Sequence, residues 1–288
     1  MNLAQYKKRH IKWEKRISIS EILELEPYII NSQIILPQAW YARMEGRLGV
    51  RGGAQIIENN PIQASRGVYK LTIKISPDHV ATYIGLSCMV ADRSIEERLA
   101  LHCIEIMARP LVTKTARIIK LKHNIENNEL ARVWFTQQDF SSYEDLHFKF
   151  FGVSLENERS KKIKTARAII ESGVKSFEKQ KVFMRSNMHV EIYPINITDH
   201  DLTISAIQLL ECIAVLEERI FESNTELNVV NLGDPINIAK KIEKFKKVFL
   251  SSKNRDSFES LFLLVENTPL FDVAVELTEI IRKKEKKC

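Results

Sequence analysis

The spacing of apolar residues predicts strands in the middle of the chain. From Val68 to Ile75, apolar side chains at every second position alternate with mostly polar ones, which is typical of a strand with one buried face. The run from Val80 to Val90 is nearly all apolar and predicts a strand buried on both faces, after a turn at residues 77–78. Four more segments have strand character: Leu99–Met107, Thr115–Leu121, Ala131–Thr136 and Leu146–Val153.

Six strands at this spacing favour a jelly-roll-like antiparallel β-sandwich, and the flanking regions make the expected fold class α+β. Residues 3–26 have a polar helical pattern that ends near Pro27, and Gln33–Leu36 predicts a short strand. The segment Gly46–Gly53 contains four of the nine glycines. It lacks the spacing of a phosphate-binding P-loop, so we interpret it as a flexible surface loop.

After Leu155 the apolar residues follow a helical period. A single strand, Met188–Ile197, interrupts this region, and Thr198 with Asp201 resembles a capping box at the start of the next helix. Proline marks the start of two further helices, at Pro235 and Pro269. The apolar stripes expected to face a core are Ala166, Ile170, Val174 and Phe177; Leu209, Ile213, Leu216 and Ile220; and Ile238, Ile242, Phe245 and Phe249.

These patterns predict three regions. Residues 1–60 form an N-terminal helix and loop extension, residues 61–158 form the β-sandwich, and residues 159–288 form a mostly helical region. The polar segment 156–162 is the expected boundary between the last two. No apolar run is long enough to span a bilayer and no secretory signal begins the chain, so we expect the protein to stay inside a cell.

Basic residues are concentrated in three stretches, although the formal net charge is only +6. Residues 1–16 carry six bases against one acid, residues 159–185 carry nine against two, and residues 240–255 carry seven against one. Such patches suit a polyanion, because each neutralised phosphate releases condensed counterions. Solvated helix faces are the alternative reading. The residues predicted to bind nucleic acid are Lys161, Lys162, Lys164, Arg167, Lys240, Lys241, Lys244 and Lys247.

No catalytic set can be assembled from the titratable residues. The seven histidines are not spaced as metal ligands, and the four cysteines form no CxxC motif. Cys88 and Cys103 lie in apolar runs that raise a thiol pKa, so we interpret them as reduced core thiols. We therefore expect no enzymatic activity, no metal and no cofactor.

Glu105 interrupts an apolar run, and a buried carboxylate is costly unless it is paired. It either faces solvent on an edge strand or forms an ion pair with Arg109 or Arg117. The aromatic-rich stretch 134–151 has two readings, base stacking and core filling.

The order of three segments resembles the thirty-kilodalton superfamily of plant-virus cell-to-cell movement proteins. These are HVATYIGLSCMV, LALHCIEIMAR and ARVWFTQQDFSSYEDLHFKFFGVSL, which together lie within residues 68–155. In this resemblance Gly85 matches the family glycine, Glu105 its acidic position and Arg109 its basic position. The resemblance implies a jelly-roll-like domain that binds single-stranded nucleic acid cooperatively and without sequence preference, and that accumulates at plasmodesmata.

The expected function is therefore that of a viral movement protein. Its expected partners are single-stranded RNA or viral nucleoprotein, a host plasmodesmal or endomembrane surface, and further copies of itself. We expect it in the host cytoplasm, at the cell periphery and at plasmodesmata. The alternative is a nucleocapsid or coat protein, because basic helical bundles and jelly rolls also package RNA.

Overall fold

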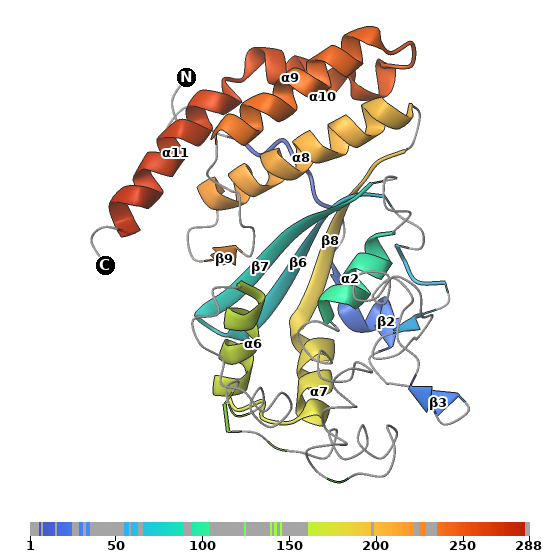
Figure 1. Cartoon of the computed structure of the whole chain (residues 1–288), viewed down its shortest axis with the longest axis vertical. Helices are drawn as coiled ribbons and strands as arrows, with labels where there is room; N and C mark the ends of the chain where they lie inside the picture. The colour runs from blue at the N-terminus through green and yellow to red at the C-terminus, as the bar shows by residue number, and fades with distance from the viewer. Residues whose placement is uncertain are drawn as a thin grey trace.

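A computed structural model of the 288-residue chain shows strands and helices packed together (Figure 1). The structure describes residues 6, 8–14, 16–24, 29–30, 33–34, 55–57, 59–62, 66–88, 94–103, 124, 139, 141–142, 145, 161–196, 199–221, 225–227 and 235–285.

The described chain is built on a five-stranded sheet with the order β1-β8-β6-β7-β9. Strands β6 (Gly67–Ser76) and β7 (His79–Ser87) form an antiparallel hairpin. Strand β8 (Met188–Pro194) pairs antiparallel with the other edge of β6, and β1 (Ile17–Ser18) adds to β8. At the opposite edge, β9 (Thr225–Leu227) runs parallel to β7.

Two smaller antiparallel pairs come from the N-terminal part of the chain. Strand β2 (Leu23–Glu24) pairs with β5 (Gln55–Ile56), and β3 (Ile29–Ile30) pairs with β4 (Gln33–Ile34). A short 3-10 helix, η2 (Ile19–Glu21), lies between β1 and β2 and has a capping box formed by Ser18 and Glu21.

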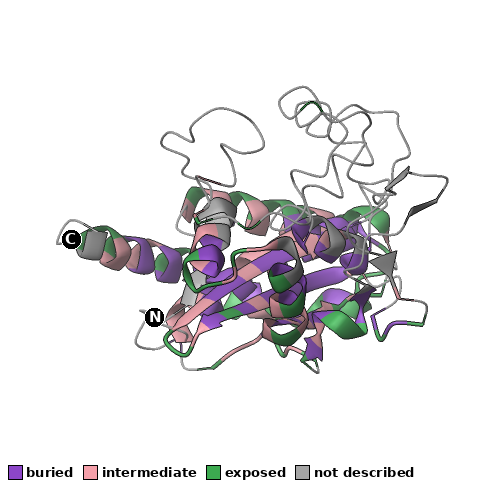
Figure 2. Cartoon of the chain, turned by 90° about the horizontal axis from the view of Figure 1, so that it is seen from below, coloured by how far each residue is buried: buried purple, intermediate pink, exposed green. Residues whose placement is uncertain are grey.

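The alternation along β6 divides the sheet into two faces. Tyr69, Leu71, Ile73 and Ile75 are buried on one face, as a strand with one buried side requires. The opposite face begins with buried Val68 and becomes progressively more exposed toward Lys74. In Figure 2 the strands are mainly coloured as buried.

Helix α8 (His200–Phe221) covers the Val68 end of that second face. The next helices form a layer on α8, away from the sheet (Figure 1): α9 (Pro235–Ser251), η6 (Asp256–Phe258), α10 (Glu259–Asn267) and α11 (Leu270–Glu285). One apolar core joins the two layers, from Val68 and Ile84 on the sheet through Leu209 on α8 to Phe245 on α9. All the apolar stripe residues predicted for α8 and α9 are buried or partly buried, which confirms these two helices.

The Tyr69 face packs against other elements. Helix α2 (Ile95–Cys103) places His102 against Tyr69, and their Nε2 and Oη atoms are 2.7 Å apart. Helix α7 (Phe177–Asn187) leads directly into β8 and packs near η2, and helix α6 (Lys161–Glu171) precedes it.

Three predictions of local structure are wrong. Residues 99–103, predicted as the start of a strand, lie in α2, where Ile95, Leu99 and Cys103 repeat every four residues and share one buried side. The described residues between 6 and 24 contain no α-helix; they are irregular up to β1 and bury Ile11 and Ile17.

The third error concerns the cap of α8. The helix begins at His200, and Asp199 caps it by accepting a hydrogen bond from the backbone N–H of Leu202 at 3.0 Å, so the cap lies one residue after the predicted position.

The fold is therefore a mixed α+β structure, in agreement with the coarse prediction. The strands predicted at residues 115–121, 131–136 and 146–153 lie outside the described residues. The five-stranded sheet takes strands from all three predicted regions, since β1, β6 and β8 come from residues 1–60, 61–158 and 159–288.

Gly85 lies opposite Tyr69 in the β6–β7 ladder. A Cβ atom at residue 85 would lie 2.5 Å from Cζ of Tyr69 and 2.7 Å from Cε1 of Tyr83, which is closer than non-bonded carbons can approach. Glycine at this position therefore makes room for the two rings.

We expect Gly85→Ala to lower the free energy of unfolding by about 1–3 kcal/mol, because the added methyl group overpacks this contact. Urea unfolding at neutral pH measures the change. In a background of Tyr69→Leu, which removes the ring, the same substitution should cost clearly less. An equal cost in both backgrounds would show that the Tyr69 ring is not the reason for the glycine.

Candidate nucleic-acid interface

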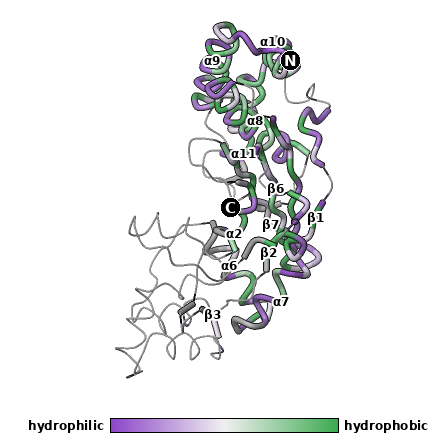
Figure 3. The backbone as a smooth tube through the Cα atoms, turned by 90° about the vertical axis from the view of Figure 1, so that its right-hand side faces the viewer, coloured by the Kyte–Doolittle hydropathy of each residue, from purple (hydrophilic) through white to green (hydrophobic). Residues whose placement is uncertain are grey.

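Helix α9 presents a row of lysines on the side opposite its core stripe. Ile238, Phe245 and Phe249 are buried, whereas Lys240, Lys244 and Lys247 are exposed at a spacing of four and three residues. This spacing keeps the three lysines on one side of a helix. Figure 3 shows hydrophilic and hydrophobic residues mixed along α9, as an amphipathic helix requires. We call Lys240, Lys244 and Lys247 the α9 lysine row.

The surroundings of the α9 lysine row are mixed. Glu243 is exposed on the same helix, and the side chains of Ile236 and Leu250 are 62% and 61% exposed near its two ends. Beyond the helix, Lys253 and Arg255 are exposed and add two more positive charges. The net charge of this surface is positive, and its exposed cations can form contacts with an anion at little desolvation cost.

Lys241 is held more firmly than the row, although Lys244 of the row also donates from its ammonium to Oε1 of Gln208 at 3.4 Å. The ammonium of Lys241 lies 3.7 Å from a carboxylate oxygen of Glu211 and donates to the backbone carbonyl of Gln208 at 3.3 Å. Burial raises the pKa of Glu211, and the charge of Lys241 opposes this effect. Lys241 therefore joins α9 to α8, and of the four predicted lysines on α9 it is the one with an acidic partner among the described residues.

The basic residues predicted near residue 161 lie on a different part of the molecule. Lys161, Lys162 and Lys164 belong to α6, but their side chains lie outside the described residues, and Arg167 is half-buried one turn later. In Figure 1, α6 lies beside the lower half of the sheet and α9 lies above its upper end. The structure does not bring the two predicted basic groups together.

The three residues named from the family resemblance have different outcomes. Gly85 lies in β7 and packs against Tyr69, as described above. Glu105 and Arg109 lie outside the described residues, as do all the aromatic residues of the stretch 134–151.

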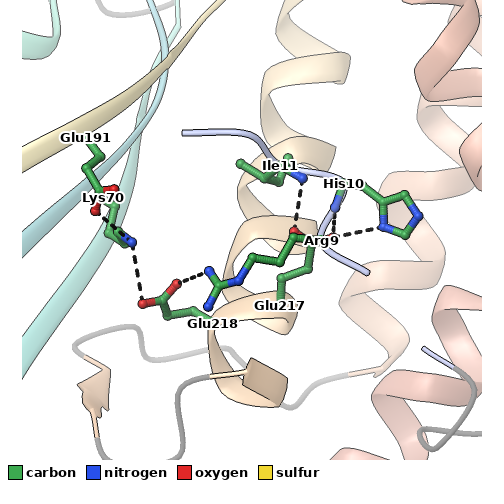
Figure 4. Close-up of polar contacts among 7 residues, drawn as sticks. All are labelled: Arg9, His10, Ile11, Lys70, Glu191, Glu217 and Glu218. Carbon is green, nitrogen blue, oxygen red and sulfur yellow. Dashed lines mark hydrogen bonds and ion pairs between the residues drawn. The ribbon is translucent and has the colours of Figure 1, made fainter. Parts of the chain in front are cut away.

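A buried carboxylate on α8 holds the N-terminal segment in place. Glu217 is 1% exposed and accepts hydrogen bonds from the backbone N–H groups of His10, at 2.7 Å, and Ile11, at 3.0 Å (Figure 4). The Tyr6 hydroxyl donates to the same carboxylate at 2.8 Å. Burial, followed by the neighbouring carboxylate charge, raises the pKa of Tyr6 well above its usual value.

The adjacent Glu218 extends these contacts to the sheet. Its carboxylate lies 3.1 Å from a guanidinium nitrogen of Arg9 and 3.8 Å from the ammonium of Lys70 (Figure 4). Lys70 also pairs with Glu191 on β8 at 2.7 Å. The N-terminal segment, α8, β6 and β8 are thus joined by one group of charged side chains with little exposure.

This group was not predicted, because the N-terminal bases were expected on a polar helix, where they would either bind a polyanion or face solvent. A signal was present, since Glu217 follows Ile213 by four residues and so lies on the apolar side of α8. A carboxylate on a buried side needs partners. Outside the helical region, the densest group of possible basic partners is the segment at residues 7–16.

The described cysteines do not have the environment of reactive thiols. Cys88 and Cys103 are buried, as predicted, and burial raises the pKa of the Cys103 thiol to about 12. Cys212 is half-buried, and its pKa is also raised by burial. The part of the chain that the structure describes contains no group of three His, Cys, Asp or Glu side chains that could hold a metal ion. None of the described helices is long and apolar enough to cross a bilayer.

Comparison with known proteins gave no relative: no protein-family model, curated protein or solved structure matches this chain.

Glu217→Gln should lower the free energy of unfolding by about 1–3 kcal/mol, because the amide keeps the volume of the side chain but loses charge-assisted hydrogen bonds to the N-terminal segment. Chemical denaturation at pH 7 measures this loss. Glu279→Gln, on the exposed side of α11, is the control and should change stability by less than about 0.5 kcal/mol. Equal stability of the two variants would mean that Glu217 does not secure the segment.

Proposed function

We propose that this protein is a non-enzymatic nucleic-acid-binding protein that serves as a plant-virus movement protein. The observation that carries the nucleic-acid part is the α9 lysine row, three exposed cations on one side of a helix whose other side is fixed in the core. A fixed helix with three exposed lysines on one side is suited to bind the phosphates of a polymer.

The chemistry of the row favours binding without sequence preference. Lysine ammonium groups are compact point charges, and they lack the planar fork that reads a base edge at two points. The row is about 10 Å long, given a rise of 1.5 Å per residue, so it spans several phosphates of one strand. Phosphate contacts position a strand and carry no sequence information.

The movement function comes from the family resemblance in residues 68–155. In this proposal the protein binds single-stranded RNA or viral nucleoprotein, forms homo-oligomers and carries its cargo through plasmodesmata. A host plasmodesmal or endomembrane surface is the second partner, and the exposed Ile236 and Leu250 beside the lysines support contact with such a surface. The finer proposal for the fold is a jelly-roll-like sandwich, whose further strands would come from residues 115–121, 131–136 and 146–153.

The triple substitution Lys240→Gln, Lys244→Gln and Lys247→Gln should weaken binding to a single-stranded oligonucleotide at low salt. It should also reduce the slope of log affinity against log salt by about 2, because three phosphate contacts are lost. Fluorescence anisotropy with a labelled homopolymer over a salt series measures both quantities. Arg282→Gln with Lys283→Gln, exposed on α11, is the control and removes two charges against three, so the losses are compared per charge. Equal losses in the two variants would argue against a localised site.

The movement function predicts the position of the protein in plant tissue. A fluorescently tagged chain expressed in leaf epidermis should form spots at cell walls where plasmodesmata lie, and the tag should spread to neighbouring cells. A diffuse cytosolic signal confined to single cells contradicts the proposal. Regular particles or rings formed by the purified protein with RNA would instead favour the alternative, a coat protein or nucleoprotein.

A further inference from the structure

Helix α8 leaves the far end of one sheet face open. Val68 and Lys70 on β6 contact α8 or the N-terminal segment, and the next two residues on the same face are Thr72, half-buried, and Lys74, exposed. His189 on β8 lies directly opposite Thr72 in the ladder. Arg16, which immediately precedes β1, is exposed beside His189. We call Arg16, Thr72, Lys74 and His189 the open-face cluster.

The cations of this cluster lack acidic partners. Within the described part of the chain, neither Arg16 nor Lys74 forms an ion pair with a carboxylate. Two carboxylates lie near the cluster, Glu21, which accepts from the backbone N–H of Ser18 at 2.8 Å, and Glu191, which pairs with Lys70 at 2.7 Å. They reduce the positive charge of the cluster and do not cancel it, because Lys70 adds a third cation to Arg16 and Lys74.

The orientation of His189 supports an anion rather than a cation as the ligand. A guanidinium nitrogen of Arg16 lies 3.3 Å from Nδ1 of His189, so this ring nitrogen accepts and the ring is neutral. Burial and then the Arg16 charge lower the pKa of His189, while Glu21 and Glu191 act in the opposite direction. In this tautomer Nε2–H remains a donor. Arg16, Glu21 and Glu191 act on the pKa of the ring, and Ser18 and Thr72 lie opposite His189 on the two neighbouring strands.

We infer that the open-face cluster is a second phosphate-binding site, separate from the α9 lysine row, which takes a phosphodiester of the bound nucleic-acid strand. Arg16 and Lys74 supply the charges, and Thr72 and His189 supply hydrogen-bond donors. Residues two apart on a strand are about 7 Å apart and neighbouring strands are about 5 Å apart, so one phosphate can reach all four side chains. This inference rests on the proposed nucleic-acid binding.

The site also makes binding depend on pH. A phosphate beside His189 stabilises the protonated ring and raises its pKa, so the strand should bind more tightly as pH falls from 7.5 to 5.5. Protonation of acids elsewhere contributes to the same trend, and for this reason a His189→Gln variant is needed as the reference.

The test measures the affinity of the full chain for a labelled single-stranded homopolymer by anisotropy. Arg16→Gln with Lys74→Gln should weaken binding roughly tenfold at low salt, whereas Arg282→Gln with Lys283→Gln should not. Between pH 7.5 and 5.5, the wild-type chain should gain roughly threefold to tenfold more affinity than His189→Gln. Inorganic phosphate is then added to the wild-type chain and to the α9 triple variant. If it displaces the strand from the triple variant and not from the wild type, the open-face cluster itself binds phosphate.

Three results would overturn this inference. In the first, the Arg16 and Lys74 double variant binds the homopolymer as tightly as the wild type, while the α9 triple variant loses binding. The proposed function then still holds. Another is an identical pH profile for wild type and His189→Gln. The third is a wild-type chain that binds no strand at low salt, which removes the nucleic-acid part of the proposed function as well.

Discussion

The structure depends on one strand, β6, that pairs along most of its length on both sides. It pairs with β7 from Gly67 to Ser76 and with β8 from Gly67 to Ile73. The first ladder is a local hairpin, but the second joins residues that are more than 110 positions apart in the chain. Closing so long a loop costs entropy, so the interactions on the two faces of β6 must offset it. Every other described layer is positioned by these two ladders.

The charged group around Glu217 and Glu218 shows how one face is completed. A buried carboxylate stabilises a fold only when its hydrogen bonds are satisfied. The backbone N–H groups of His10 and Ile11 satisfy the carboxylate of Glu217. The basic N-terminal segment is therefore partly structural, since Arg9 compensates Glu218 and covers Phe221 with its guanidinium 5.3 Å from the ring centre. Positive charge in a sequence is thus not the same as positive charge available to a ligand.

The same distinction separates the bases along α9. Lys241 is used to join α9 to Glu211, and Lys246 pairs with Glu266 on α10, whereas the lysines of the outward row remain exposed. The open-face cluster lies on the sheet and is built from three segments, before β1, on β6 and on β8. Two positive surfaces on one rigid framework would hold a strand at two points, which raises the effective concentration of the second contact once the first has formed.

The sequence alone determined the elements whose pattern is local. The period of two predicted β6, the apolar run predicted β7, and the apolar stripes at 209–220 and 238–249 predicted α8 and α9. Prediction from the sequence failed where contacts between residues far apart in the chain determine the local structure. Leu99–Cys103 is apolar enough for a strand, yet it packs as a helix on the Tyr69 face. The N-terminal bases lie in an irregular segment rather than a helix, and Glu217 binds the backbone of this segment. Only the tertiary structure determines which lysines remain exposed. It also brings Arg16, Thr72 and His189 together, because both features depend on long-range pairing that local spacing does not encode.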